Sequence, residues 1–368
     1  MEELKIPDNP YLLLTPGPLS CSKSVRAALL RDWCTWDADY NEEVVQRIRQ
    51  RLVALATSKT EDYAVVLMQG SGSFAVEAAL GSAVPQRGRL LILTNGAYGQ
   101  RMARMAEILK LPHQVQAWPE TAALSPETVD RTLAENQELT HVALVHCETT
   151  TGLLNPLADL ARVIKARGKT LIVDAMSSFG GLKFDAGDLG LDFIISSANK
   201  CIQGVPGFAF VIARRAELEK CRGLARSHCL DLYDQWREMD QTGKWRFTSP
   251  THAVRAFLQA LEELETEGGI SSRQARYTEN QRVLVAKMRE LGFETLLPDY
   301  LQSPIITAFK YPGGPEFNFQ GFYHKVKARG FVLYPGKVSQ TDTFRIGSIG
   351  DIYPKDMRRL AAAIRDMD

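Results

Sequence analysis

A turn rich in glycine and serine, Gly70–Ser73, separates an apolar run from a helical pattern in "QGSGSFAVEAAL" (69–80). Such a turn exposes backbone N–H groups at the start of a helix, where an anion such as a phosphate binds well. The same residues also fit an ordinary strand–helix connection in which Ser73 caps the helix. The segment is not a Walker loop, because no Lys-Ser or Lys-Thr pair follows the glycines.

Two charged residues follow later apolar runs of the chain. Asp174 ends "LIVD", and Lys200 comes 26 positions later, after "FIISSAN". Ligands of open α/β sheets bind outside the carboxyl ends of the strands, which is where both side chains would lie. Asp174 could instead cap the next turn, and Lys200 could be a surface lysine whose stem lies on apolar neighbours. A lysine removed from water there would have a lowered pKa and could form a Schiff base.

The turn, the carboxylate and the lysine together match what pyridoxal 5′-phosphate requires. The turn would hold the 5′-phosphate, Asp174 would keep the ring nitrogen protonated, and Lys200 would bond to the aldehyde. A different class of protein also contains such features. In a nucleotide-binding or regulatory α/β protein the turn would hold a nucleotide and Lys200 would be structural.

The elements that must position these residues alternate between strand and helix. Helical patterns at 73–84, 99–110 and 157–168 separate most of six short apolar runs, at 64–69, 89–95, 140–148, 170–176, 192–199 and 208–214. Most runs are continuously apolar, which is typical of strands covered on both faces of a mostly parallel sheet. About eight residues separate the last two runs, too few for a parallel crossover, so 208–214 is predicted to run antiparallel.

The length of 368 residues suits about two domains of ~150 residues each. A pattern that begins near Pro250 and stops at Gly268-Gly269 predicts a long connecting helix. A second helix (about 272–291), a strand-rich end and a closing helix (about 354–367) follow it. We therefore expect an N-terminal segment, a large domain, the connecting helix and a smaller C-terminal α/β domain, at 1–20, 21–249, 250–269 and 270–368.

Composition excludes several classes of function. The net charge is +1, so the chain has no general attraction to nucleic acid or anionic membranes. The six cysteines form no CxxC pair and no zinc spacing, so we expect reduced thiols and no metal. The acidic N-terminus is not a signal peptide, and no run approaches the ~20 apolar residues of a spanning helix. We expect a cytoplasmic protein that binds neither nucleic acid nor membrane.

The segments in their order resemble the class V aminotransferases of fold type I, over nearly the whole chain. The likeness rests on "GSGS" and on "LLLTPGPLS" (12–20), "NGAYGQR" (95–101), "CETTTGLLNP" (147–156), "VDAMSSFGG" (173–181) and "SSANKCIQGVPG" (196–207). The resemblance implies an α/β fold with a large cofactor-binding domain, a mostly parallel mixed sheet and a smaller C-terminal domain. It also implies pyridoxal 5′-phosphate as the cofactor and a homodimer with shared active sites.

The resemblance assigns roles to individual residues. Lys200 and Asp174 would be catalytic, as the Schiff-base lysine and the partner of the ring nitrogen. The cofactor-binding residues would be Ser71, Gly72, Ser73, Tyr98, Thr149, Asp174, Asn199, Lys200, Trp245 and Thr248. Tyr98 would stack on the ring, although a buried core tyrosine is the alternative, and Thr149 would lie beside the phenolic oxygen.

The remaining cofactor contacts implied by the resemblance involve the phosphate. Asn199 stands where relatives often have glutamine, so whether it contacts the phosphate or only packs beside Lys200 stays open. Trp245 and Thr248 would reach the phosphate of the neighbouring subunit's cofactor.

Three further segments point to members that use 2-aminoethylphosphonate and pyruvate: "CTWDADYN" (34–41), "KWRFTSPTH" (244–252) and "YPGKVSQTDTFRIGSIG" (334–350). By the same resemblance Arg345 would bind the substrate's anionic group, for which guanidinium geometry is well suited. A surface ion pair is the alternative. Alternation along the strand predicts that Arg345 faces away from Phe344 and Ile346.

The phosphonate lies one carbon farther from the amine than a carboxylate does, so a second donor is needed unless Arg345 serves both anions. Trp36, Lys337 and Arg246 are the candidates. The alternative activity is alanine:glyoxylate or serine:pyruvate transamination, which shares the core site. A lyase or hydrolase acting on the phosphonate is disfavoured, because the sequence has no metal cluster or nucleophile elbow.

Overall fold

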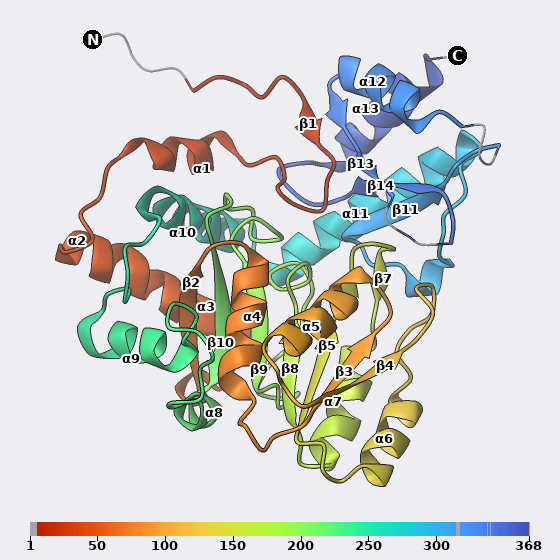
Figure 1. Cartoon of the computed structure of the whole chain (residues 1–368). Coiled ribbons are helices and arrows are strands. Elements are labelled where there is room, and N and C mark those ends of the chain that lie inside the picture. Colours follow the sequence, from red (N-terminus) through yellow and green to blue (C-terminus); the bar gives the residue numbers. More distant parts are fainter. Residues whose placement is uncertain (1–5, 314–316, 337, 339, 368) are drawn as a thin grey trace.

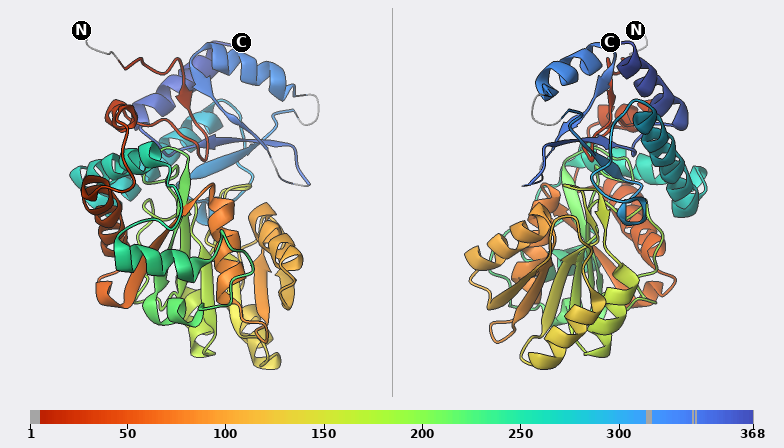
Figure 2. Two further views of the ribbon diagram at one scale, coloured as in Figure 1. Left: turned by 60° about the vertical axis from the view of Figure 1, so that its left-hand side comes forward. Right: turned by 90° about the vertical axis from the view of Figure 1, so that its right-hand side faces the viewer.

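The computed structural model describes residues 6–313, 317–336, 338 and 340–367. These residues form a seven-stranded sheet covered by helices, with a smaller three-stranded sheet and its helices beyond one end of it (Figure 1, Figure 2). In both figures the smaller unit lies above the large sheet, and the N- and C-terminal regions meet there.

The large sheet is mixed, as the sequence predicts. Its strands in spatial order are β2 (Tyr63–Gln69), β10 (Phe208–Arg214), β9 (Phe193–Ser197), β8 (Thr170–Asp174), β5 (His141–Val145), β3 (Leu90–Thr94) and β4 (His113–Ala117). Strand β10 pairs antiparallel with both β2 and β9, while the pairs from β9 to β4 are parallel. The antiparallel prediction for 208–214 is therefore confirmed. The edge strand β4 was not predicted, because "HQVQA" is polar and largely accessible.

The strands of the large sheet other than β4 contribute side chains to two separate cores. In β2, Val65 and Leu67 join one core, whereas Val66 and Met68 join the other. The first core lies under α3 (Arg47–Ala56), α6 (Pro126–Glu135), α7 (Leu157–Ala166) and α10 (Thr251–Thr266), and the second under α4 (Gly72–Ala83), α5 (Ala97–Ile108) and α9 (Leu232–Thr242). This double coverage explains why the strands are continuously apolar.

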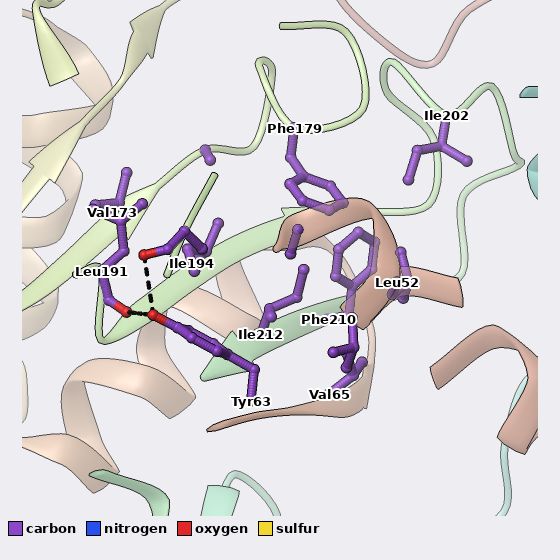
Figure 3. Packing of buried hydrophobic residues seen from close by; sticks show 14 of the residues in the cluster. Leu52, Tyr63, Val65, Val173, Phe179, Leu191, Ile194, Ile202, Phe210 and Ile212 are labelled. Carbon is purple, nitrogen blue, oxygen red and sulfur yellow. Dashed lines mark hydrogen bonds between the residues drawn. The ribbon is translucent and has the colours of Figure 1, made fainter. Parts of the chain in front are cut away.

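The core beneath α3 and α10 includes the buried tyrosine Tyr63, whose hydroxyl is hydrogen-bonded (Figure 3). The Tyr63 hydroxyl lies 2.8 Å from the Leu191 carbonyl oxygen, to which it donates, so its burial leaves no polar group unmatched. Phe179 and Phe210 pack edge to face in the same core, 5.7 Å apart. On the opposite face β10 presents only Ala209, Val211 and Ala213, and these small side chains let α4 approach the sheet closely.

The smaller unit is built around strand β14 (Thr343–Gly347), which pairs antiparallel with β11 (Ile306–Lys310) and β13 (Tyr334–Pro335). Its helices are α11 (Gly269–Glu290), α12 (Phe319–Ala328) and α13 (Pro354–Arg365). The N-terminal strand β1 (Leu12–Leu13) pairs in parallel with β12 (Phe331–Val332) of this unit. The first residues of the chain therefore belong structurally with its end, which no local pattern in the sequence indicates.

Shorter elements complete the chain. They are α1 (Lys23–Ala27), a 3₁₀ turn (Ala28–Leu30), α2 (Ala38–Tyr40), a π-helical stretch (Asn41–Gln46), 3₁₀ turns at Thr60–Asp62 and Asp299–Leu301, β6 (Cys147–Glu148), β7 (Leu153–Leu154) and α8 (Arg215–Lys220). The predicted connecting helix corresponds to α10, which begins directly after Pro250 and ends just before Gly268-Gly269. Among the described residues, no helix has both the length and the apolar character needed to cross a membrane.

Candidate active site

A cavity of about 190 Å³ opens at the carboxyl edge of the large sheet. Because β2, β5, β8 and β9 all end at this edge, residues from distant parts of the sequence meet there. Seven of the ten predicted cofactor residues line the cavity: Ser71, Gly72, Ser73, Tyr98, Asp174, Asn199 and Lys200. The structure therefore brings together the turn, the carboxylate and the lysine.

The Gly70–Ser73 turn leads directly into α4, which begins at Gly72. Ser71, rather than Ser73, occupies the cap position, and its side chain makes no capping hydrogen bond, so the alternative with Ser73 as cap is wrong. A Cβ atom on Gly72 would lie 2.4 Å from the sulfur of Met176, so a larger residue there would have to displace that side chain. The uncapped start of α4 is thus pressed against the loop that follows Asp174.

Asp174 is the last residue of β8, and its side chain is buried at the floor of the cavity. Its Oδ1 accepts a hydrogen bond of 2.9 Å from the Met176 amide. Burial raises the pKa of Asp174 to about 6, although that hydrogen bond and the charges of Lys200 and Arg101 act in the opposite direction. At neutral pH the carboxylate is mostly ionised, and a cationic N–H group would stabilise it.

Lys200 follows β9 and is held by the N-terminal segment of the chain. Its Nζ donates a hydrogen bond of 2.9 Å to the Pro16 carbonyl oxygen. Burial lowers the pKa of Lys200, and the negative charge of Asp174 opposes that shift. Gly17 has φ +114°, and a Cβ there would lie 2.7 Å from both the Asn199 carbonyl oxygen and Lys200 Cδ. The conspicuous "TPGP" was the only sequence signal for this contact.

The buried residue Glu148 connects the segments around Tyr98 and Thr150, and sequence reasoning gave it no role. Its Oε2 accepts from the Tyr98 amide at 3.2 Å, and its Oε1 accepts from the Thr150 hydroxyl at 2.7 Å. Burial raises the pKa of Glu148 to about 7, although these hydrogen bonds lower it. A Cβ on Gly96 would lie 2.3 Å from Glu148 Cγ, so the backbone that precedes Tyr98 packs directly on this side chain.

Arg345, on β14 of the smaller unit, reaches the same region. Its Nη1 donates to the Thr149 carbonyl at 2.8 Å, and its Nε donates to the Pro335 carbonyl at 2.9 Å. Phe344 and Ile346 lie in the core of the smaller unit, which confirms the prediction that Arg345 faces the other way. Arg345 is only 3% exposed, yet its hydrogen bonds to described residues go to these two carbonyl oxygens and not to a carboxylate. Burial lowers the pKa of this guanidinium.

Thr149, Trp245 and Thr248 do not line the cavity of this chain. Thr149 is buried and meets Arg345 through its carbonyl oxygen. Trp245 and Thr248 line a separate groove, together with Trp36 and Arg246.

Two of the three candidate second donors for a phosphonate, Arg246 and Trp36, also lie outside the cavity of their own chain. Arg246 is engaged by the His228 carbonyl at 2.8 Å and by Asp234 at 3.1 Å. The exposed ring of Trp36 lies under the Lys244 ammonium, 3.5 Å from it. Lys337 lies outside the described residues.

The residues of the cavity fit the expected cofactor, pyridoxal 5′-phosphate. The start of α4 offers backbone N–H groups to a phosphate, since no side chain from Ser71 caps them. Asp174 offers a buried carboxylate whose raised pKa a protonated ring nitrogen would relieve. Lys200 offers an amine whose lowered pKa favours the neutral, nucleophilic form.

Comparisons with known proteins agree with this geometry. The profile of the family described as "Aminotransferase class-V" matches residues 38–322. The 2-aminoethylphosphonate–pyruvate transaminases of Phocaeicola vulgatus and Syntrophobacter fumaroxidans are both 60% identical to the chain; the first match covers 97% of this chain and 98% of the relative, and the second covers 100% and 98%. An alanine–glyoxylate aminotransferase structure from Nostoc superposes with a TM-score of 0.89 at 22% identity, covering 100% of this chain and 97% of that one.

The family profile spans most of the chain, and the two relatives match the chain over 97% and 100% of its length. The solved structure supports the fold independently of sequence identity. The chain belongs to the class V aminotransferases and has the fold of the type I pyridoxal-phosphate enzymes.

Proposed function

We propose that the protein transfers the amino group of 2-aminoethylphosphonate to pyruvate, giving phosphonoacetaldehyde and L-alanine. The observation that carries the proposal is the buried guanidinium of Arg345, which among the described residues donates to two carbonyl oxygens rather than to a carboxylate, and whose charge acts on Lys200. A buried cation without a carboxylate partner is costly unless an anion binds it, and both proposed substrates are anions. The printed names of the two 60%-identical relatives supply the identity of those substrates.

Lys200 is the proposed catalytic acid and base. When bound, pyridoxal phosphate supplies an aldehyde that bonds to amines and a ring that accepts the electron pair left by a departing proton. Lys200 Nζ, with its lowered pKa, would take the proton from the carbon that bears the substrate's amino group and later return it. The Pro16 carbonyl oxygen would orient that nitrogen while it is protonated.

Asp174 and the start of α4 are the proposed anchors of the cofactor. The carboxylate of Asp174 would hold the proton on the ring nitrogen, while Ser71, Gly72 and Ser73 would bind the phosphate. Asn199 lines the same cavity, and its Oδ1 accepts from Ser197 at 3.1 Å, an orientation that leaves its amide N–H groups for the phosphate.

Tyr98 and Thr149 are the proposed neighbours of the cofactor ring. Tyr98 lines the cavity and would stack on the ring. The hydrogen bond from its backbone amide to Glu148 supports this role, because it fixes the start of α5. Thr149 would lie beside the phenolic oxygen, although its carbonyl oxygen already holds Arg345. Arg345 would bind the phosphonate of the donor and the carboxylate of pyruvate in turn, with paired N–H bonds.

A homodimer with shared sites is also part of the proposal. Trp245 and Thr248 lie away from the cavity of their own chain, in a groove where Trp36 is 77% exposed. A second copy of the chain packed on this groove would bring Trp245 and Thr248 to the partner's cofactor. We propose the same division into domains as in the sequence analysis, with the large domain at 21–249 and the small one at 270–368, and a cytoplasmic location.

The amino donor is tested by single-turnover mixing of the cofactor-loaded enzyme with aminoethylphosphonate, alanine or serine. Aminoethylphosphonate should convert the absorbance of the loaded enzyme to that of the aminated cofactor, and pyruvate should restore it. Conversion by alanine or serine but not by aminoethylphosphonate would instead establish the alternative activity. Lys200→Ala should abolish steady-state turnover, and retained turnover would exclude Lys200 as the catalytic base.

A further inference from the structure

Arg101, on α5, lines the cavity next to the turn that would hold the phosphate. Its Nη1 donates a hydrogen bond of 3.1 Å to the Ser73 hydroxyl. Its guanidinium carbon lies 5.0 Å from the ring centre of Tyr98, and its charge lowers the pKa of Asp174. Arg101 is therefore in contact with the phosphate turn and with the residue expected to stack on the cofactor.

The charge of Arg101 acts on the Asp174 carboxylate without forming an ion pair with it. Within the residues that the structure describes, Arg101 takes part in no ion pair, whereas Arg104, one turn farther along α5, pairs with Glu107 of the same helix. The turn itself contains no lysine or arginine, and Lys200 is held by the Pro16 carbonyl. A phosphate bound at Ser71–Ser73 would otherwise have a dianionic charge close to the carboxylate of Asp174 without a dedicated cation.

We propose that Arg101 is the cationic ligand of the cofactor's 5′-phosphate, acting together with Ser73. A guanidinium suits this task because it makes charge-assisted, paired hydrogen bonds to tetrahedral oxyanions. Its existing bond to the Ser73 hydroxyl shows that both groups point to one place. The inference depends on the cofactor and not on the amino donor, so it stands whichever substrate the enzyme uses.

Two other roles for Arg101 make different predictions. If Arg101 only ties α5 to α4 through Ser73, its loss would disturb the cavity for every ligand of that shape. If it binds the substrate's phosphonate instead, its loss would raise the KM for aminoethylphosphonate and leave cofactor affinity intact. A pair of ligands that differ only in the phosphate separates these roles.

The experiment measures the affinity of the apoenzyme for pyridoxamine 5′-phosphate and for pyridoxamine, through quenching of intrinsic fluorescence. Both ligands are amines, so neither forms a covalent bond with Lys200 and the affinities report non-covalent contacts alone. The variants are Arg101→Gln, Arg101→Lys and the control Arg104→Gln, which removes an exposed arginine of the same helix.

Arg101→Gln should lower the affinity for pyridoxamine 5′-phosphate by about 10- to 100-fold, which is the range for losing a hydrogen bond to a charged group. The affinity for pyridoxamine should stay unchanged. Arg101→Lys keeps the charge without the paired N–H groups and should give a smaller loss that is still confined to the phosphorylated ligand. Arg104→Gln should bind both ligands as the unaltered chain does.

Three results would overturn the proposal. Equal losses for both ligands would assign Arg101 a structural role. Unchanged affinity for pyridoxamine 5′-phosphate, with or without a raised KM for aminoethylphosphonate, would remove Arg101 from the phosphate site. If Arg101→Gln does not fold, the Arg101→Lys variant decides. An equal loss of affinity for both ligands in Arg101→Lys would contradict the proposal in the same way.

Discussion

Replacing Glu148 by glutamine should change how the stability of the apoprotein depends on pH. Glu148 is completely buried, and burial raises its pKa from 4.5 to about 7. The unfolded chain releases this proton near the ordinary value, so between these two pKa values the folded protein holds more protons than the unfolded one. The stabilisation from the protonated form is therefore fully present below pH ~4.5 and is lost as the pH rises through about 7.

The size of the effect follows from the two pKa values. Between about pH 5 and about pH 8, the difference in proton binding removes roughly 2–3 kcal/mol from the free energy of unfolding. Glutamine has the same size and no proton to lose. Its side-chain oxygen can accept from the Tyr98 backbone amide, and the Thr150 hydroxyl can accept from its carboxamide N–H, so any cost of the replacement is the same at both pH values.

The assay is urea denaturation of the apoprotein at both pH values, followed by far-ultraviolet circular dichroism. Relative to the unaltered chain, the free energy of unfolding of Glu148→Gln should gain roughly 2–3 kcal/mol when the pH rises from about 5 to about 8. Glu138→Gln, which alters an exposed side chain, reports the effect of the same replacement at the surface. A stability difference between Glu148→Gln and the unaltered chain that is the same at both pH values would refute the reasoning.

Three more changes test the site. Asp174→Asn should lower kcat by ~10²–10⁴-fold while cofactor absorbance persists, because an amide cannot hold the ring proton; near-normal kcat would contradict this. Arg345→Lys should raise the KM of both substrates by about 10- to 100-fold, since paired N–H bonds are lost, and steady-state kinetics with an unchanged KM would count against the anion role. Gly17→Ala should destabilise the protein by about 1–3 kcal/mol, because Gly17 has φ +114° and a Cβ there would lie 2.7 Å from Lys200 Cδ. The same change should slow the labelling of Lys200 by the cofactor aldehyde, measured after trapping with borohydride. A normal melting temperature with normal labelling would refute this prediction.

The central sheet was predictable because its strands are buried on both faces and separated by amphipathic helices. The antiparallel direction of the strand at 208–214 followed from the length of one connection alone. The predicted strands at β8 and β9 placed Asp174 and Lys200 at the carboxyl edge of the sheet, where the structure has them. The polar edge strand β4 lacked the apolar run on which that prediction rests, so it went undetected.

The missed parts of the site depend on contacts between residues far apart in the chain. The Pro16 carbonyl reaches Lys200 only because β1 is anchored on β12, and sequence periodicity does not encode that pairing. Glu148 reads as one polar residue after a strand, and its burial appears only when the backbone at Gly96 packs on it. Arg101 sits on an exposed helical turn, where sequence alone gives no reason to separate it from Arg104.

The position of β2 at the edge of the sheet has a consequence during synthesis on the ribosome. Among the strands that the structure describes, its one neighbour in the large sheet is β10, and α4 packs on β10 and β9. The ribosome must add about 140 residues after Gln69 before Phe208 emerges, which takes roughly 7–30 s at ~5–20 residues per second. The nascent chain therefore carries β2 without its sheet partner for that time, and the hydrogen bond from the Gly70 amide to the Gly207 carbonyl oxygen, at the start of the Gly70–Ser73 turn, forms only after Gly207 has been made.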